Sequence, residues 1–148
     1  MNLFDSLQIS ASGLHSQRTV ITVISENMAN VHTTRTEEGG PYLRKRAILT
    51  PARIPSDSSF FELLNRRMGR EPLGVKVLDV VQDSEGLKTV FDPSHPDADE
   101  TGLVSMPNVN LMEEMVALLA ASRVFEANVA AFNAAKTMAL KSLEIGNR

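Results

Sequence analysis

Apolar side chains recur at heptad spacing along the first thirty residues of the chain. The main positions are Leu7, Leu14, Ile21 and Met28, with Leu3, Ala11, Ile24 and Val31 at helical offsets from them. This spacing is typical of one apolar seam on a helix. We therefore predict a helix over residues 2–31, in which Gly13 costs about 1 kcal/mol relative to alanine.

The C-terminal segment repeats the pattern more strongly. One register contains Leu111, Leu118, Phe125, Phe132 and Ala139, and a second contains Met115, Val129 and Leu143. Asn110 followed by Glu113 resembles a capping box, and Gly146 is a natural stop. The pattern predicts a helix over 111–145, about 50 Å long at 1.5 Å per residue.

The middle of the chain is rich in turn-forming residues. Residues 35–106 contain all the prolines except Pro107 and six of the eight glycines. Alternating residues over 75–81, a turn over 83–86 and the run 87–91 predict a β-hairpin. Residues 57–68 fit either a short helix or a strand.

Together these elements predict a mainly α fold. Long N- and C-terminal helices would form an elongated coiled-coil-like hairpin, with a small β-rich insert between them. We expect three segments: a helix over 1–34, the β and loop insert over 35–106, and the long helix over 107–148, which packs with the first. The length of 148 residues fits one domain, or a discontinuous domain that carries an insert.

Both helices are expected to pack on more than one side. The first carries only Asp5, Arg18 and Glu26 as charges, and the second is rich in alanine, which lets neighbouring helices approach closely. A lone two-helix hairpin buries too little apolar surface to offset the entropy of ordering its backbone. Polymerisation or a multi-chain bundle is the leading interpretation, and an ordinary intramolecular hairpin capped by a β domain is the alternative.

Composition and charge exclude several classes of function. The 15 basic and 18 acidic residues give a net charge of -3, without the basic excess of a nucleic-acid-binding protein. The absence of cysteine excludes disulfides, thiolate zinc sites and a cysteine nucleophile. No window approaches the roughly 20 apolar residues that are needed to span a bilayer, so we expect no insertion into a membrane. The N-terminus lacks the pattern of a signal peptide, so export would use another route.

One acidic loop is the only candidate for site chemistry. It contains Asp92, Pro93, His95, Pro96, Asp97 and Asp99. Carboxylates and imidazole bind metals, but the spacing matches no metal-binding loop and the prolines fix the backbone. We predict a rigid, hydrogen-bonded structural loop, and no metal, cofactor, small-molecule substrate or catalytic residue.

Charge is unevenly distributed in the insert. Residues 35–76 contain nine basic and five acidic residues, whereas residues 77–100 contain one basic and seven acidic residues. Opposite patches of this kind fix register between adjacent subunits when they meet. Solvated surfaces, or pairing within the chain, are equally compatible with this distribution.

Several motifs resemble those of the axial proteins of the bacterial flagellum, most closely the proximal rod proteins of the FlgC type. The motifs are Ser12-Gly13-Leu14, Asn27-Met28-Ala29-Asn30, Thr33-Thr34-Arg35-Thr36, Gly39-Gly40-Pro41-Tyr42, Arg44-Lys45, the 92–99 loop, Pro107-Asn108-Val109-Asn110, Glu114-Met115-Val116, Ala121-Ser122-Arg123 and Phe125-Glu126-Ala127-Asn128-Val129. The resemblance covers both ends and much of the middle. It is weakest over residues 51–72 and 82–87.

The resemblance implies a non-enzymatic structural subunit. Such subunits stack helically into the rod that crosses the periplasm and transmits torque, and they leave the cell through the flagellar type III export apparatus without a cleaved signal. The expected partners are other copies, other rod subunits and that apparatus. The residues expected to pack within and between subunits are Leu7, Leu14, Ile21, Ile24, Met28, Leu111, Met115, Leu118, Phe125, Val129 and Phe132.

Two other functions are weighed against this one. A soluble helical adaptor or chaperone would use the same helical hairpin in a compact, discrete oligomer. A metal-dependent hydrolase would centre on His95, Asp97 and Asp99.

Overall fold

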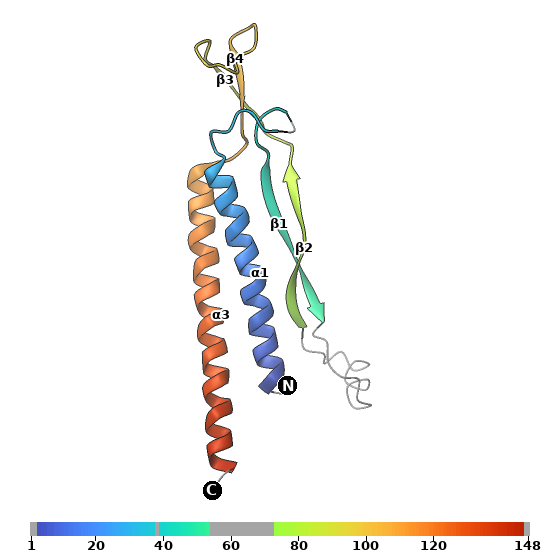
Figure 1. The fold of residues 1–148 in the computed structure, drawn as a ribbon, viewed down its shortest axis with the longest axis vertical. Coiled ribbons are helices and arrows are strands. Elements are labelled where there is room, and N and C mark those ends of the chain that lie inside the picture. Colours follow the sequence, from blue (N-terminus) through green and yellow to red (C-terminus); the bar gives the residue numbers. More distant parts are fainter. Residues whose placement is uncertain (1–2, 38, 54–72, 147–148) are drawn as a thin grey trace. The chain divides into compact units, whose positions relative to one another are not determined.

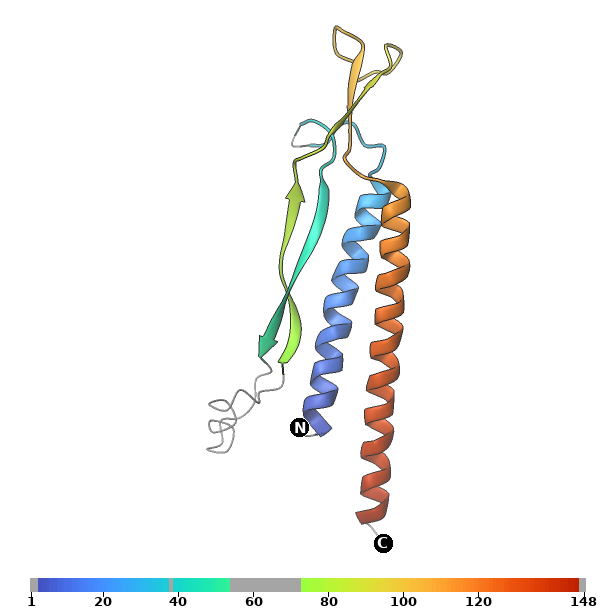
Figure 2. The ribbon, with the colours of Figure 1, turned by 180° about the vertical axis from the view of Figure 1, so that it is seen from behind.

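In the described part of the chain, a long helix precedes four strands and a second long helix follows them. The computed structural model describes residues 3–37, 39–53 and 73–146. The elements are α1 (Leu3–Ala29), β1 (Arg44–Arg53), β2 (Leu73–Asp83), β3 (Lys88–Phe91), β4 (Leu103–Met106) and α3 (Leu111–Gly146) (Figures 1 and 2). The predicted terminal helices and β-rich insert are confirmed. The ambiguous segment 57–68 lies outside the described residues.

The start of α3 is capped as the sequence predicts. Oδ1 of Asn110 accepts a hydrogen bond from the backbone N–H of Met112 at 3.1 Å. The side-chain amide of Asn110 donates to the Glu113 carboxylate at 2.9 Å. This satisfies one of the N–H groups that a helix leaves free at its first turn, and it fixes the helix start at Leu111.

The helix α1 continues without a break through Gly13. A Cβ at this position would lie 3.1 Å from Oδ1 and 3.2 Å from Nδ2 of Asn128. The Asn128 amide is itself held by a 3.0 Å hydrogen bond to the carbonyl of Val124. Because glycine has no Cβ, the Asn128 side chain can approach the backbone of α1 at this position. This close packing explains why a residue that weakens a helix lies within α1.

The strands form two separate two-stranded sheets. β1 pairs with β2, and the two arrows run in opposite directions in Figure 1. β3 pairs antiparallel with β4, so that Val90 faces Val104 and Phe91 faces Leu103.

The predicted hairpin between 75–81 and 87–91 is wrong. Both segments are strands, but each pairs with a strand that is not its expected partner. The side-chain amide of Asn108 donates to the carbonyls of Asp83 and Glu85, at 2.7 Å each. The turn carbonyls are thus bound by a residue far along the chain, and long-range pairing overrides the local turn signal.

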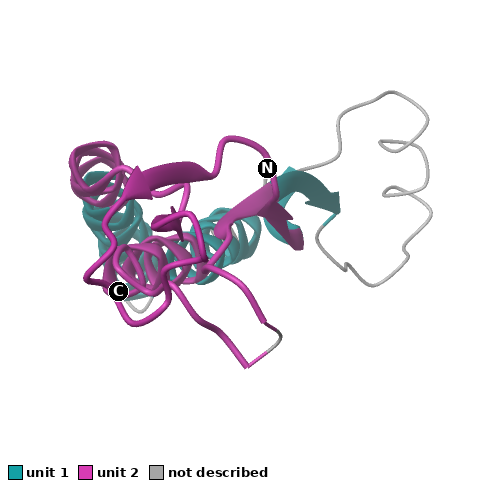
Figure 3. Ribbon diagram, turned by 90° about the horizontal axis from the view of Figure 1, so that it is seen from above, with its two compact units in different colours: residues 1–18, 49–78, 122–148 teal, residues 19–48, 79–121 magenta. Residues whose placement is uncertain are grey.

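Contacts divide the chain into two compact units (Figure 3). Unit 1 comprises residues 1–18, 49–78 and 122–148, and unit 2 comprises residues 19–48 and 79–121. Both terminal helices contribute to each unit. The expected division into segments 1–34, 35–106 and 107–148 describes regions of the chain, and it stays a prediction.

Unit 1 joins α1 to β2 through hydroxyl groups. The backbone N–H of Val75 donates to the Ser12 hydroxyl at 3.1 Å, and the Ser16 hydroxyl donates to the Val75 carbonyl at 3.1 Å. One helical turn separates the two serines, so they lie on the same face of α1. The uncharged polar residues of α1 therefore satisfy a strand backbone.

Unit 2 contains most of the buried apolar side chains among the described residues. They are Val23, Ile24, Tyr42, Val104, Val109 and Ala121. The C-terminal part of α1 lies beside the first turns of α3 in this unit (Figures 1 and 2). Its core is small and is completed by the polar residues described below.

The surface of α3 corrects one expectation from the sequence. Among the described residues, α3 is the one helix that is long and apolar enough to cross a membrane, and almost none of its most apolar stretch is buried. Arg123 and Glu126 lie within this helix, but its many alanines keep its mean hydropathy high. The exposed surface of the helix is therefore apolar and needs a cover.

Candidate functional site

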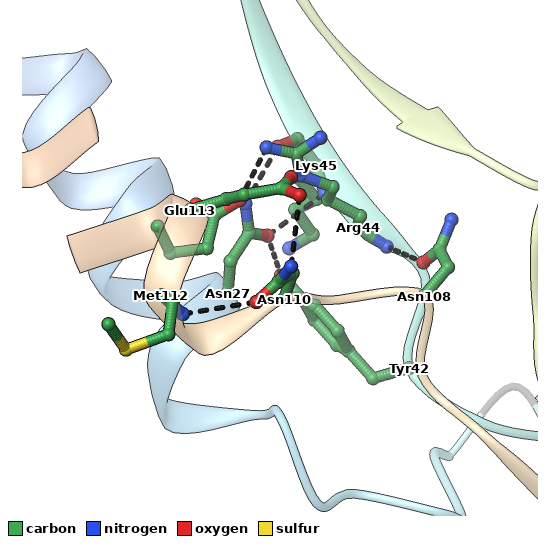
Figure 4. Close-up of polar contacts among 9 residues, drawn as sticks. Asn27, Tyr42, Arg44, Lys45, Asn108, Asn110, Met112 and Glu113 are labelled. Atoms are coloured by element: carbon green, nitrogen blue, oxygen red, sulfur yellow. Dashed lines mark hydrogen bonds and ion pairs between the residues drawn. The ribbon is translucent and has the colours of Figure 1, made fainter. Parts of the chain in front are cut away.

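A buried asparagine organises the centre of unit 2. Asn27 is only 1% exposed. Its Nδ2 donates to the Lys45 carbonyl at 2.9 Å and to Oε2 of Glu114 at 3.2 Å. Its Oδ1 accepts from the Tyr42 hydroxyl and from the Lys45 backbone N–H, each at 2.9 Å (Figure 4). Both donors and both acceptor sites of the amide are used, which fixes its orientation.

Glu114 is the buried charge of the same cluster. It is 1% exposed, and its Oε1 accepts from Nη2 of Arg44 at 2.6 Å and from Nε of Arg44 at 2.7 Å. Its position near the N-terminus of α3 adds the favourable field of the helix dipole. A buried carboxylate is tolerated here because both oxygens are hydrogen-bonded and an arginine neutralises it. We call Asn27, Tyr42, Arg44, Lys45 and Glu114 the junction.

Tyr42 stays protonated within the junction. Burial raises the pKa of Tyr42 to about 12, and the negative charges of Glu26 and Glu114 act in the same direction. Nζ of Lys45 lies 5.8 Å from the centre of the Tyr42 ring and 3.1 Å from the Glu26 carboxylate. The hydroxyl is therefore kept as a donor to Asn27.

Asn108 extends the junction to the strands. Its Oδ1 accepts from the backbone N–H of Arg44 at 2.8 Å (Figure 4). Its side-chain amide donates to the carbonyls of Asp83, at the end of β2, and of Glu85. The end of α1, the start of β1, the turn after β2 and the start of α3 are thus joined. Every buried side-chain nitrogen and oxygen in the described part of the chain has a partner. This arrangement positions elements, and it offers no unpaired group for catalysis.

The sequence analysis did not assign the junction residues as a site. All five lie within the motifs that carried the resemblance to the flagellar rod proteins. A usable signal was present in Glu114, a charged residue three positions after Leu111 and four before Leu118 on the apolar seam. A charge on a seam requires a buried partner.

The 92–99 loop is held by hydrogen bonds. The Ser94 hydroxyl and backbone N–H donate to Asp92 Oδ1, at 2.6 and 3.0 Å, and lower the pKa of Asp92. Nδ1 of His95 accepts from the backbone N–H of Asp97 at 3.1 Å. The Thr34 hydroxyl donates to Asp97 at 2.8 Å. These hydrogen bonds fix the conformation of the loop and attach it to Thr34, as expected for a structural loop.

The metal site considered for this loop has no geometric basis. Across residues 3–37, 39–53 and 73–146, no group of three or more His, Asp or Glu side chains is placed to hold a metal ion. His95, Asp97 and Asp99 instead take part in local turns, since Asp99 accepts from the Thr101 backbone N–H at 3.2 Å. Pro93 and Pro96 are both exposed.

The expected packing residues differ in exposure. Ile24 is buried, and Leu111 and Met115 are exposed. The half-buried residues are Leu7, Leu14, Ile21, Met28, Leu118, Phe125, Val129 and Phe132. The assignment of all these residues to subunit packing stays a prediction.

A second apolar stripe on α3 was not assigned from the sequence. Met112, Val116 and Leu119 lie at helical spacing, and each is at least 65% exposed. Exposed Ala120 and Ala127 continue it towards the C-terminus. These positions lie beside the heptad seam, so the heptad pattern does not mark them.

Comparisons with known proteins place these features in a family. Residues 100–145 match the family model of the C-terminal region of flagellar basal body rod FlgEFG proteins. The chain is 43% identical to the flagellar basal-body rod protein FlgC of Borreliella burgdorferi, over 98% of both chains. It is 42% identical to FlgC of Bacillus subtilis over 99% of both chains, and 35% identical to FlgC of Escherichia coli over 99% of this chain and 97% of the relative. The chain therefore belongs to the FlgC family of flagellar basal-body rod proteins.

Proposed function

We propose that this protein is a non-enzymatic structural subunit of the bacterial flagellar basal-body rod. Similarity to FlgC proteins over almost the whole chain supports this role. The junction is consistent with a structural role, because its polar groups form the hydrogen bonds and ion pairs that join helices to strands. The partners are other copies of the chain and other rod subunits.

Assembly proceeds through the terminal helices. The single observation that carries this step is the uncovered apolar face of α3, where Leu119 is 66% exposed. Large exposed apolar patches are rare on monomeric proteins and mark interaction surfaces. The exposed alanines of α3 allow a neighbouring helix to pack closely against it.

The helices form the inner layer of the polymer. In this proposal α1 and α3 make an elongated coiled-coil-like hairpin, and the heptad residues Leu14, Phe125 and Phe132 pack within and between subunits. The insert over 35–106 forms an outer layer that meets neighbouring subunits. Copies related by a constant rotation and rise generate a helical rod.

The rod crosses the periplasm as a drive shaft and transmits torque. The subunit reaches it through the flagellar type III export apparatus, without a cleaved signal peptide. Segment 1–34 would serve in export first and as packing surface later. These steps rest on the family, and the charge-poor surface of α1 agrees with a helix that is finally covered.

No observation favours the adaptor or chaperone alternative. Such a protein would form a compact oligomer of fixed size, with its apolar helix faces covered inside it. The relatives are named as rod proteins, and the described residues hold no metal-binding cluster for a hydrolase.

The proposal is tested by replacing one exposed apolar residue. Leu119→Gln should leave the stability of the isolated chain unchanged, because the side chain makes few contacts within it. It should remove the protein from purified basal bodies and abolish swimming. Lys136→Gln, an exposed change on the same helix, is the matched control and should assemble normally.

A second variant addresses the seam itself. Phe125→Asp places a charge among half-buried residues and should block rod assembly. Normal rods and normal swimming with both Leu119→Gln and Phe125→Asp would overturn the proposal.

A further inference from the structure

The ribbon of β3 and β4 carries apolar side chains on both of its faces. Alternate residues of a strand point to opposite faces. On one face Val104 is 2% exposed, whereas Val90 opposite it is 45% exposed. On the other face Phe91 pairs with Leu103, and these side chains are 69% and 40% exposed. We call Phe91 and Leu103 the ribbon patch.

The aromatic ring of the ribbon patch lies close to Gly102. Gly102 has a φ of +75°, and a Cβ there would lie 3.0 Å from Cε2 of Phe91 and 3.2 Å from Pro93. Any larger residue at this position would displace the ring or strain the backbone. An exposed phenylalanine has few rotatable bonds, so it loses little side-chain entropy when a partner covers it.

Carboxylates lie in the turn that precedes β4. Asp97, Asp99 and Glu100 are all exposed. The backbone N–H of Asp99 donates to the Leu103 carbonyl at 3.0 Å, which places this turn next to the ribbon patch. Asp97 accepts from the Thr34 hydroxyl and Asp99 from a backbone N–H, so their hydrogen-bond donors are neutral. Within the described ranges, none of the three takes part in an ion pair.

The same unit carries a surface of complementary composition on β1. Arg46 and Ile48 are both exposed, and they point to the same face because they are two positions apart. The neighbouring Arg44 and Lys45 are engaged by Glu114 and Glu26. Arg46 takes part in no ion pair with any residue that the structure describes. This surface combines an apolar side chain with an available positive charge.

We propose that the ribbon patch of one copy docks on the Arg46 and Ile48 face of β1 in a second copy. Phe91 and Leu103 cover Ile48, and Glu100 pairs with Arg46. This inference deepens the proposed function and rests on it, because a polymer brings each surface of one copy against another copy. The two patches are different, so the contact is heterologous and propagates along a helix. Charge complementarity sets the register of this contact.

The chain offers a clean cross-linking test, since it contains no cysteine. Bacteria that express the full chain in two forms, Leu103→Cys and Ile48→Cys, should yield a disulfide-linked dimer in purified basal bodies after mild oxidation. Lys88→Cys with Ile48→Cys is the matched control, because Lys88 lies on the other face of the ribbon. It should give no dimer.

A charge exchange supplies the second measurement. Glu100→Lys and Arg46→Glu should each lower the yield of the Leu103–Ile48 cross-link several-fold. The chain that carries both changes should recover the yield of the cross-link. In that chain the new positive charge at position 100 of one copy can pair with the new negative charge at position 46 of the next, so the two charges are exchanged but still opposite. Both residues are exposed, so neither change should alter folding.

The outcomes separate this inference from the proposed function. The docking contact would be overturned if basal bodies contain the chain but no Leu103–Ile48 cross-link forms. It would also be overturned if the double charge exchange does not restore the yield of the cross-link. Either result would leave the assignment to the rod unchanged. Absence of the unmodified chain from basal bodies would overturn both.

Discussion

The side-chain amide of Asn27 donates a hydrogen bond to the buried carboxylate of Glu114, across 87 positions of sequence, with Nδ2 and Oε2 3.2 Å apart. Asn27 lies near the end of α1 and Glu114 in the first turn of α3. A polar contact of this kind tolerates no slippage, because a shift of one residue would leave an amide and a charge unpaired. The register of the two helices in unit 2 is thus fixed by polar groups as well as by apolar contacts.

The first prediction concerns the charge at the centre of the junction. Arg44→Met should destabilise the folded chain by about 3–5 kcal/mol, because it leaves Glu114 buried without a counter-ion. Arg46→Met, an exposed change on the same strand, should stay within about 0.5 kcal/mol. Denaturant unfolding followed by circular dichroism gives both values, and equal midpoints for the two variants would refute the role of the ion pair.

The second prediction concerns Gly13 and Asn128. Alanine is better than glycine in a helix by about 1 kcal/mol. The new methyl group would meet the Asn128 amide at 3.1–3.2 Å, so Gly13→Ala should gain little or nothing on its own. In an Asn128→Ala background the same change should stabilise the chain by about 1 kcal/mol. A double-mutant cycle measures this difference, and identical effects in the two backgrounds would show that the contact is unimportant.

The third prediction concerns Tyr42 in alkaline solution. Its pKa is raised from 10.0 to about 12 in the folded chain. Between these values the unfolded chain releases the proton and the folded chain keeps it, so stability falls as pH rises through this window. The free energy of unfolding falls by on the order of 2 kcal/mol across this window. Below pH 10 the tyrosine makes its full contribution to stability. Tyr42→Phe should lack this extra loss when unfolding is compared at pH 9 and pH 11.

The fourth prediction concerns the isolated subunit. The heptad residues near the start of α1, such as Leu7, are only half-buried in a single chain. We expect amide hydrogens around Leu7 to exchange faster in dilute monomer than those around Asn27, which the junction holds. Assembly should then slow exchange around Leu7. Full protection of residues 3–18 in dilute monomer would contradict the need for covering neighbours.

The helices were predictable because their signals are local and periodic. The seam through Leu7 and Phe125 and the cap at Asn110 are visible in short windows, and the structure places helices there. The cost of Gly13 to the helix stays a prediction, and its partner Asn128 lies 115 positions later, where no local signal identifies it.

The strand partners and the junction were not predictable in the same way. The run 87–91 was recognised as a strand, yet its partner begins at Leu103, and the carbonyls of the expected hairpin turn are bound by Asn108. Asn27 looks like a solvated polar residue when read alone, and the position of Glu114 on the apolar seam does not identify its partners. Only the tertiary fold brings a donor and an acceptor together so that burial becomes favourable.

The most direct test of a rod subunit is electron microscopy of basal bodies purified from the bacterium that carries this chain. We predict that the chain is found in the rod, with α1 and α3 running along the rod axis and with Val116 and Leu119 covered by a neighbouring subunit. Absence of the chain from the rod, or a rod in which Val116 and Leu119 face solvent, would contradict assembly through the exposed face of α3.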